Sequence, residues 1–203
     1  MWKFIVNGGP VMVPMVLASI VAFAFIIERG LALRRKKIIP SELESELIDN
    51  KYHDLEKLVE LCDAMPSVLS RLVKIAIEHI NSSKSEIVDV LQTRARKEIV
   101  DLERGLVVLE VITGIAPLLG LVGTLHGLIK LFAGLGSTAL TDAAKLSEGI
   151  SITLNTTLMG LLIAIPSLIA WVYYSRKIEE VTVEMETLLD HFIRQYLKKR
   201  KKV

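Results

Sequence analysis

The sequence lacks the residue patterns typical of enzyme sites, and it has too few cysteines for a disulfide scaffold. Cys62 is the only cysteine, so no disulfide can form within one chain. There is no phosphate-binding glycine loop, no cluster of His and Cys at metal-ligand spacing, and no recognisable nucleophile arrangement. We therefore predict no enzymatic activity, no metal and no cofactor.

Apolar residues make up 51% of the 203 residues, but they are not spread evenly as in a soluble domain. They concentrate in three segments, Val11–Ile27, Val111–Leu125 and Ile150–Ser175. Each approaches or reaches the roughly 20 residues that a helix needs to cross a hydrocarbon core of about 30 Å. The first segment lacks a small-residue cleavage site, which favours a retained anchor over a signal peptide. The sequence thus predicts three transmembrane helices.

Basic residues orient these helices, because Lys and Arg near span ends are mostly retained in the cytoplasm. Three basic segments would lie on the cytoplasmic side: Arg34–Lys37, the basic residues of 94–104 and the tail Lys198–Lys202. Only Lys3, Lys130 and Lys145 would lie on or near the outer side. We expect a bacterial inner-membrane protein with a periplasmic N-terminus and a cytoplasmic C-terminus. The basic tail suits anionic lipid headgroups, and no nucleic-acid recognition motif accompanies it.

This orientation divides the chain into six predicted segments. They are a periplasmic N-terminus and first transmembrane helix (1–31), a cytoplasmic helical region (32–105), the second transmembrane helix (106–134), a periplasmic loop (135–148), the third transmembrane helix (149–175), and a cytoplasmic C-terminal helix with a basic tail (176–203).

The predicted cytoplasmic region has helical patterning. Ser41 with Glu44, and Ser83 with Glu86, fit the capping box at a helix start. We expect helices over Ser41–Asp63 and Pro66–Ile80, and one from Lys84 to about Gly134 that is on the order of 75 Å long. After residue 176, apolar residues recur every three or four positions and need a partner helix. These are Ile178, Val181, Met185, Leu188, Leu189, Phe192 and Tyr196.

Small and hydroxyl-bearing residues form one stripe on each of the last two predicted spans. On the second span the stripe is Thr113, Pro117, Gly120, Thr124 and Gly127, and on the third it is Gly149, Thr153, Thr156, Thr157, Gly160, Ala164 and Ser167. Helix packing explains the glycines fully. For the threonines, packing and an ion pathway lined by hydroxyl oxygens both remain open.

An ion pathway usually also needs a carboxylate that binds and releases the ion. No Asp or Glu lies near the middle of any predicted span, and Glu28 and Glu110 fall close to the cytoplasmic ends. If protons are conducted, the titrating carboxylate is expected from another subunit. Asn155 lies off its stripe and is expected to bond a neighbouring helix or subunit, and Pro166 lacks an N–H for its helix.

Five stretches of the sequence resemble the ExbB and TolQ branch of the MotA/TolQ/ExbB family. They are Thr93–Arg96, Leu102–Leu106, Gly114–Thr124, Gly149–Ser151 and Asn155–Pro166, and Gly8–Pro10 and Glu28–Arg29 agree as well. The resemblance implies an all-α integral membrane protein with three transmembrane helices and long cytoplasmic helical extensions, assembled as a homopentamer. It also implies a partner like ExbD or TolR, with a single span and a membrane Asp.

In that family, ion flow energises TonB or TolA, and the resemblance assigns Thr124 and Thr157 to the pore-facing threonines. We add Thr153 and Thr156 to the predicted ion pathway, and Pro117, Gly120, Gly160, Asn155 and Pro166 to predicted packing positions. Many relatives have Gly-Ile-Ala-Glu where this chain has Ile152 in place of the acid, which leaves proton and sodium open. The alternatives are a MotA-like flagellar or gliding stator and a membrane scaffold without transport.

Overall fold

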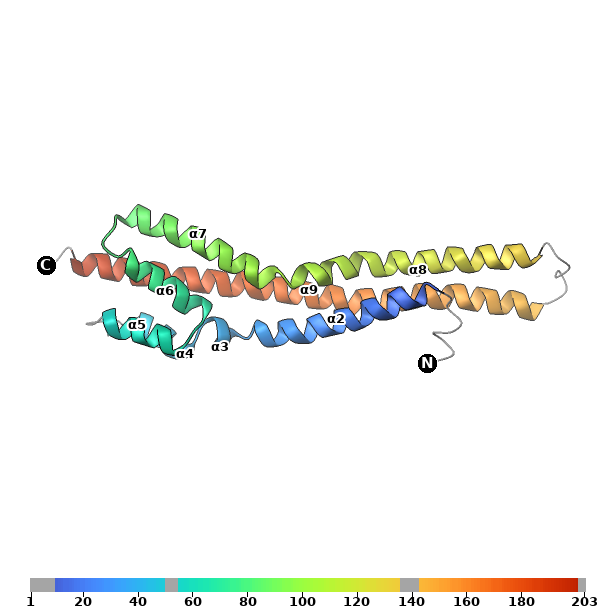
Figure 1. Cartoon of the computed structure of the whole chain (residues 1–203), viewed down its shortest axis with the longest axis horizontal. Helices are drawn as coiled ribbons and strands as arrows, with labels where there is room; N and C mark the ends of the chain where they lie inside the picture. Colours follow the sequence, from blue (N-terminus) through green and yellow to red (C-terminus); the bar gives the residue numbers. More distant parts are fainter. Residues whose placement is uncertain (1–9, 50–54, 136–142, 201–203) are drawn as a thin grey trace. The chain divides into compact units, whose positions relative to one another are not determined.

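The computed structural model describes residues 10–49, 55–135 and 143–200, and every regular element in these ranges is an α-helix (Figure 1). The side chains of 133–135, 143–148, 152, 199 and 200 lie outside the description, as do Lys3 and most of the predicted loop 135–148. The helices form two compact units. The membrane unit comprises Met1–Glu28 and Gly105–Tyr173, and the charged unit comprises Arg29–Arg104 and Tyr174–Val203.

Three helices of the described chain are long and apolar enough to cross a membrane. They are α2 (Met12–Ala32), α8 (Leu106–Leu135) and the apolar part of α9 (Ala143–Arg200). Large apolar side chains point outward from each helix, such as Phe23 at 67% and Ile129 at 67% exposure. This arrangement suits a hydrocarbon surrounding. The predicted all-helical fold with three candidate spans is therefore confirmed, whereas the homopentamer and the membrane sides of the segments stay predictions.

Helices α8 and α9, which carry the two stripes of small residues, each continue through a proline. These are Pro117 in α8 and Pro166 in α9. A proline removes one backbone N–H, which in water would favour ending the helix. In a membrane the remaining backbone groups have no water to bond, so the helical hydrogen bonds on either side are retained.

Among the described residues of the charged unit, five helices accompany the last part of α9. They are α3 (Arg35–Ile38), α4 (Ser41–Asp49), α5 (Leu55–Ala64), α6 (Val68–Glu78) and α7 (Lys84–Glu103). Helix α6 packs against α3, α5 and α7, and Leu69, Leu72 and Val73 on α6 are almost completely buried. The hydrophobic core of this unit therefore forms around α6 and the apolar face of α9.

The apolar stripe predicted at the end of the chain is buried within the charged unit. Its members from Ile178 to Phe192 are each at most 7% exposed, and Ile193 beside them is 2% exposed. Tyr196 is half-buried. The expectation that this stripe needs partner helices is confirmed, and the partners are helices of the same chain.

Helix starts in this unit partly follow the predicted capping boxes. The hydroxyl of Ser83 accepts from the Glu86 N–H at 3.3 Å, and that of Ser67 accepts from Ser70 N–H at 3.0 Å. The expectation for Ser41 is wrong, because α4 already includes Ser41, and the Glu44 N–H bonds the Pro40 carbonyl at 3.0 Å. Since Pro40 supplies the first acceptor of the helix, Ser41 occupies a helical position instead of the cap.

The expectation of a single helix from Lys84 to about Gly134 is also wrong in one respect. Helix α7 ends at Glu103 and α8 begins at Leu106, with Arg104 and Gly105 as a turn between them. Glycine stabilises a helix less than any residue other than proline. A glycine at this position therefore permits the helical hydrogen bonds to be interrupted.

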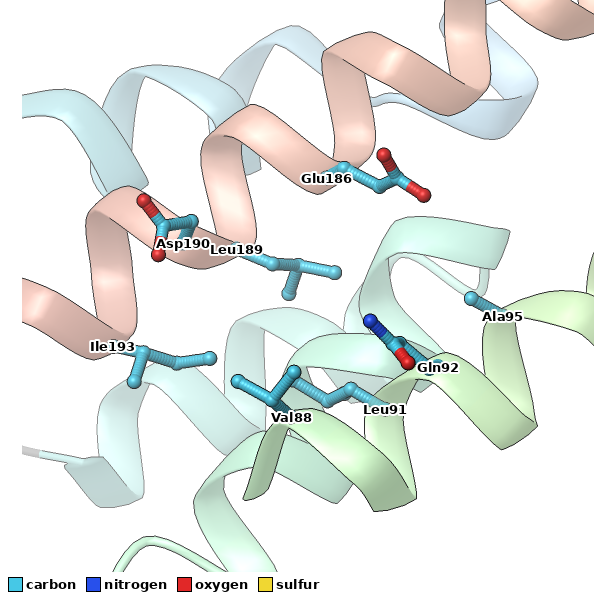
Figure 2. A pocket seen from close by; sticks show the side chains of 8 residues that line it. All are labelled: Val88, Leu91, Gln92, Ala95, Glu186, Leu189, Asp190 and Ile193. Atoms are coloured by element: carbon cyan, nitrogen blue, oxygen red, sulfur yellow. The ribbon is translucent and has the colours of Figure 1, made fainter. Parts of the chain in front are cut away.

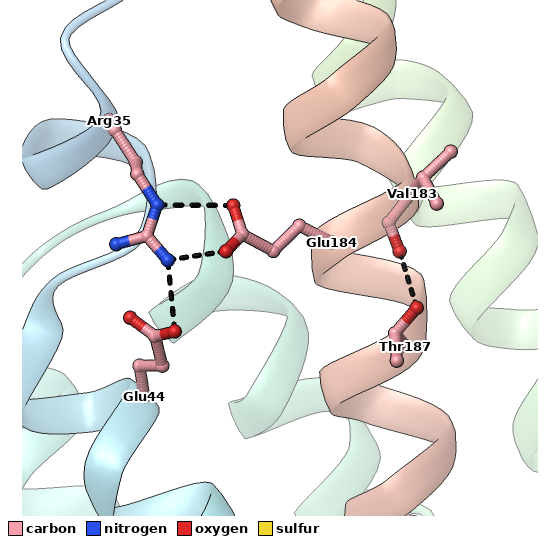
Figure 3. Close-up of polar contacts among 5 residues, drawn as sticks. All are labelled: Arg35, Glu44, Val183, Glu184 and Thr187. Carbon is pink, nitrogen blue, oxygen red and sulfur yellow. Dashed lines mark hydrogen bonds and ion pairs between the residues drawn. The ribbon is translucent and has the colours of Figure 1, made fainter.

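Ion pairs join elements of the charged unit that are distant in sequence. Arg35 on α3 pairs with Glu184 on α9 and with Glu44 on α4, where its Nη2 lies 2.9 Å from Oε1 (Figure 3). The bonds to Glu184 and then to Glu44 raise the pKa of Arg35. Arg71 on α6 donates from Nε to Glu98 on α7 at 3.0 Å. These bonds hold α3, α4 and α6 to the longer helices.

Candidate functional site

Helices α8 and α9 approach closely along the two small-residue stripes. A Cβ at Gly120 would lie 3.1 Å from the Cα of Thr157, and one at Gly160 would lie 2.6 Å from the carbonyl oxygen of Ala116. A side chain at Gly160 would require the backbone to shift, and one at Gly120 would be closer to backbone atoms than an ordinary van der Waals contact. The predicted packing role of Gly120 and Gly160 therefore agrees with the geometry of this contact.

Two threonine hydroxyls face each other across the contact. Thr124 Oγ1 of α8 and Thr157 Oγ1 of α9 form a hydrogen bond. Thr124 Oγ1 also lies 3.1 Å from the Gly120 carbonyl oxygen and 3.2 Å from that of Thr153. Both threonines are half-buried, so the pair opens on one side of the helix contact. We call Thr124 and Thr157 the hydroxyl pair.

The hydroxyl pair has more acceptors than hydrogens. Each hydroxyl carries one hydrogen and two lone pairs. Thr124 can donate to only one of the Gly120 and Thr153 carbonyls and Thr157 at a time, and Thr157 has no other hydrogen bond among the described residues. The pair therefore offers free oxygen lone pairs to a water, a hydronium or a dehydrated cation that approaches from its open side.

Thr153 and Thr156 lie deeper in the same contact. They are 3% and 0% exposed, and their hydroxyls donate to carbonyls of their own helix, to Ile150 at 2.7 Å and Thr153 at 2.8 Å. Their side chains face glycines of α8, because a Cβ at Gly123 would lie 2.8 Å from the Cβ of Thr156, and one at Gly127 would lie 2.4 Å from the Cγ2 of Thr153. The stripe thus contains two kinds of threonine.

The other predicted residues are placed around this contact. Pro117 is half-buried, and Pro166 is exposed. Asn155 is half-buried, and no hydrogen bond of its amide is found within the described part of the chain. The structure thus brings the threonines and the glycines together, but it does not bring Asn155 or Pro166 to them.

The ionisable side chains of α8 are at least partly exposed. Glu110 and Lys130 are exposed, and His126 is half-buried. Between Val111 and Phe132 and between Gly149 and Tyr173 the sequence has no acidic residue. No group of three His, Cys, Asp or Glu that could hold a metal ion occurs among the residues described. The second and third candidate spans therefore supply no carboxylate to the hydroxyl pair.

Sequence reasoning missed two residues of the contact, Gly123 and Ala116. Ala116 is fully buried, and its carbonyl oxygen is the atom nearest to the missing side chain of Gly160. Gly123 faces Thr156. A repeat of small residues at spacings of three and four, Ala116, Gly120, Gly123 and Gly127, was the signal that could have identified them.

Helix content, apolar length and the buried small-residue contact define the class: an all-helical membrane protein whose second and third candidate spans pack backbone to backbone. A model of the MotA/TolQ/ExbB proton channel family matches residues 64–187, which is more than half of the chain. The chain belongs to the MotA/TolQ/ExbB proton channel family. The matched region includes the hydroxyl pair and all of α7 and α8.

Individual relatives carry ExbB and TolQ names. The chain is 32% identical to ExbB-like protein 1 of Synechocystis sp. over 169 residues, which cover 81% of this chain and 66% of that protein. It is 25% identical to the Tol-Pal system protein TolQ of Pseudomonas aeruginosa over 210 residues, covering 95% of this chain and 90% of TolQ. It is 28% identical to the biopolymer transport protein ExbB of Pseudomonas putida over 178 residues, covering 83% and 53%. The chain thus spans just under two thirds of the first of these relatives.

Proposed function

We propose that this protein is a stator-type channel subunit of an inner-membrane motor of the ExbB–ExbD or TolQ–TolR kind. In this proposal five copies surround a partner with a single span, and ion flow across the membrane does work on a protein like TonB or TolA. The N-terminus faces the periplasm and the C-terminus faces the cytoplasm. The single observation that carries the proposal is the half-buried hydroxyl pair in a chain of the MotA/TolQ/ExbB family.

Within this proposal Thr124 and Thr157 line the ion pathway. Their lone pairs are open on one side, and each can exchange the donor role with the other. Thr153 and Thr156, which we also predicted for the pathway, lie deeper in the helix contact than the hydroxyl pair and support its position. The carbonyl of Thr153 accepts from Thr156 and is also one of the acceptors open to the Thr124 hydroxyl.

The absent carboxylate is expected from the partner. The second and third spans have no acid at the depth of the hydroxyl pair, and a threonine hydroxyl does not titrate at accessible pH. An Asp on a partner span would bind the ion, and the hydroxyl pair would coordinate it or the carboxylate during transfer. One charge crossing 100 mV releases about 2.3 kcal/mol, so a few ions per step supply useful work.

The choice of ion stays open in the proposal. The family resemblance places Ile152 where many relatives have an acid, and the side chain of Ile152 lies outside the description. The ion is therefore proton or sodium. The load is nutrient uptake, envelope maintenance, gliding or secretion, and the periplasmic part of the partner decides between these.

Reconstitution into liposomes tests the division of labour between this chain and its partner. We expect little or no ion flux under an imposed potential with this protein alone, and flux when a single-span partner with a membrane Asp is added. Changing that Asp to Asn removes the flux, because an amide cannot take up and release a proton at accessible pH. A sodium gradient at fixed pH then distinguishes the two ions.

Selective flux through this chain alone would contradict the proposal and would direct attention to Glu110 and His126. No flux with any such partner, although the two proteins co-purify, would favour the scaffold alternative. A MotA-like flagellar or gliding stator would be favoured if the co-purifying partner anchors flagellar or gliding machinery rather than a protein like TonB or TolA.

A further inference from the structure

A groove in the charged unit lies between α7 and α9, and Figure 2 shows Leu189 pointing across it toward Val88 and Leu91. It has a volume of about 220 Å³, below the roughly 300–1,000 Å³ of pockets that take drug-sized ligands. Its acid Asp190 is already paired with Arg194 at 2.5 Å. Packing between the two helices therefore explains the groove, and the contacts that imply a further role lie beside the hydroxyl pair.

Thr156 of α9 has a buried hydroxyl that is confined on two sides. The residue is 0% exposed, and its Oγ1 donates to the Thr153 carbonyl at 2.8 Å. On the side of α8 its side chain fills the space at Gly123, where a Cβ would lie 2.8 Å from the Cβ and 2.9 Å from the Oγ1 of Thr156. A β-branched side chain also has few rotamers in a helix. This hydroxyl therefore acts on an ion pathway only through the carbonyl that it bonds.

The carbonyl of Thr153 has two lone pairs but three donors within reach. In the continuous helix α9 the Thr157 N–H takes one lone pair, because each helical N–H bonds the carbonyl four residues before it. The Thr156 hydroxyl takes the other. The Thr124 hydroxyl, whose oxygen lies 3.2 Å away, is the third donor. A carbonyl that already accepts two hydrogen bonds is a weaker acceptor for Thr124.

This occupancy affects where the single hydrogen of Thr124 points. If Thr124 donates to a carbonyl, Thr157 donates to the Thr124 oxygen and its hydrogen points into the helix contact. If Thr124 donates to Thr157 Oγ1, the Thr157 hydrogen is free to point to the open side of the pair. With the Thr153 carbonyl occupied, the carbonyl of Gly120, 3.1 Å from Thr124 Oγ1, is the one that still competes among the described residues.

We infer that Thr156 is a positioning residue that favours donation from Thr124 to Thr157. The Thr157 hydroxyl then presents its hydrogen to a carboxylate on the open side, and its remaining lone pair faces a cation there. The inference rests on the proposed function, in which the carboxylate of the partner approaches this side. It deepens that function by naming a residue that acts on the hydroxyl pair without touching the ion. It also gives Gly123 a role, because a side chain at that position would displace Thr156.

A double-mutant cycle of thermal unfolding tests the link between Thr156 and Thr124 in the purified chain, without a partner. Thr156→Val keeps the β-branched shape and removes the hydroxyl. In the native background the Thr124 hydroxyl takes the vacated lone pair of the Thr153 carbonyl, whereas in a Thr124→Val background no hydroxyl replaces it. We therefore expect Thr156→Val to lower the unfolding midpoint by about 2–4 °C more in the Thr124→Val background, the shift that one hydrogen bond gives in a chain of this size.

Thr113→Val is the matched control background for this cycle. The Thr113 hydroxyl donates to the Leu109 carbonyl of its own helix at 2.9 Å, so the effect of Thr156→Val should be the same there as in the native chain. Equal effects in all three backgrounds would overturn the inference, because Thr124 would then not respond to Thr156. That result would leave the proposed function standing.

Partner-dependent flux in liposomes tests the consequence for ion transfer. Thr156→Val should lower the flux by about two- to tenfold, the range set by the net contribution of one hydrogen bond. Thr156→Ser retains the hydroxyl without the methyl group and should restore most of the flux. Native flux in Thr156→Val, or equal loss in both variants, would return Thr156 to packing alone. Absence of flux from the native complex would refute the proposed function, and the unfolding cycle would still decide whether Thr156 directs Thr124.

Discussion

At the residue scale, the threonines of the two stripes differ in the hydrogen bonds that their hydroxyls make. Thr153 and Thr156 are buried and donate to carbonyls of their own helix, as threonines in membrane helices commonly do. Thr124 and Thr157 bond each other between two helices and stay half-buried. A role in ion transfer is therefore expected first for the hydroxyl pair.

Thr157→Val tests this role, because valine has nearly the same volume but no hydroxyl. We expect assembly to be retained and ion-driven work to be lost, measured as oligomer mass and as partner-dependent flux in liposomes. Thr113→Val is the matched control, since the Thr113 hydroxyl donates to the Leu109 carbonyl of its own helix at 2.9 Å. Normal flux in Thr157→Val would return Thr157 to a packing role.

Glu98 is a buried acid whose charge is compensated. It is 5% exposed and accepts from Arg71, and Arg94 Nε lies 3.4 Å away. The hydrogen bond from Arg71 lowers the pKa of Glu98 below its ordinary value of 4.5, against the effect of burial. A carboxylate with a lowered pKa stabilises the fold above its unfolded pKa, and this stabilisation is lost as the pH falls through the folded value.

Glu98→Gln is expected to cost about 1.5–3 kcal/mol at neutral pH, the range for hydrogen bonds to charged groups. The difference in thermal unfolding between the native chain and this variant should shrink as the pH falls below about 4.5, because protonation removes the same charge from native Glu98. Thermal unfolding in detergent between pH 7 and pH 3 measures both effects. A constant difference across this range would contradict the assigned ion pair.

At the scale of elements, the contact between α8 and α9 depends on backbone approaching backbone. The nearest atom to a Cβ at Gly160 is the carbonyl oxygen of Ala116, which cannot rotate away as the end of a side chain can. By contrast, a Cβ at Gly114 on α8 would meet no atom within 4 Å. The two glycines therefore offer a matched pair for one substitution.

Gly160→Ala is expected to destabilise the protein by about 1–3 kcal/mol, the usual cost of overpacking, and to separate the hydroxyl pair. Gly114→Ala should leave the stability of the isolated chain unchanged or raise it slightly, because alanine favours a helix over glycine by about 1 kcal/mol. Thermal unfolding of both variants in the same detergent measures this difference. Equal effects would show that the close contact of Gly160 does not limit the packing.

At the scale of the whole molecule, the proposed ring makes a direct prediction. Native mass spectrometry in mild detergent should find a homopentamer, because a half-open hydroxyl pair forms a pathway only when copies or a partner enclose it. A stable monomer or dimer as the only species of the native chain would count against the assembly.

The sequence predicted correctly that the elements are helices. The apolar segments are long enough to read as spans, and the spacing from Ile178 to Phe192 predicted a buried helical face. The errors were local: Pro40 instead of Ser41 supplies the first acceptor of α4, and Gly105 permitted the turn between α7 and α8. Each error reflects a choice between backbone acceptors that lie within one helical turn, which periodicity does not resolve.

The sequence by itself determined the helical class, the apolar spans, the stripes of small residues and the absence of an acid within the last two spans. Periodicity suffices for these because it assigns each residue to a face of its own helix. Only the tertiary structure decided that Thr124 meets Thr157 while Thr156 is buried against Gly123, that Arg35 reaches Glu184, and that α7 and α9 leave a groove. These features depend on the register and separation of two helices distant in sequence, and the atoms that set them lie on both.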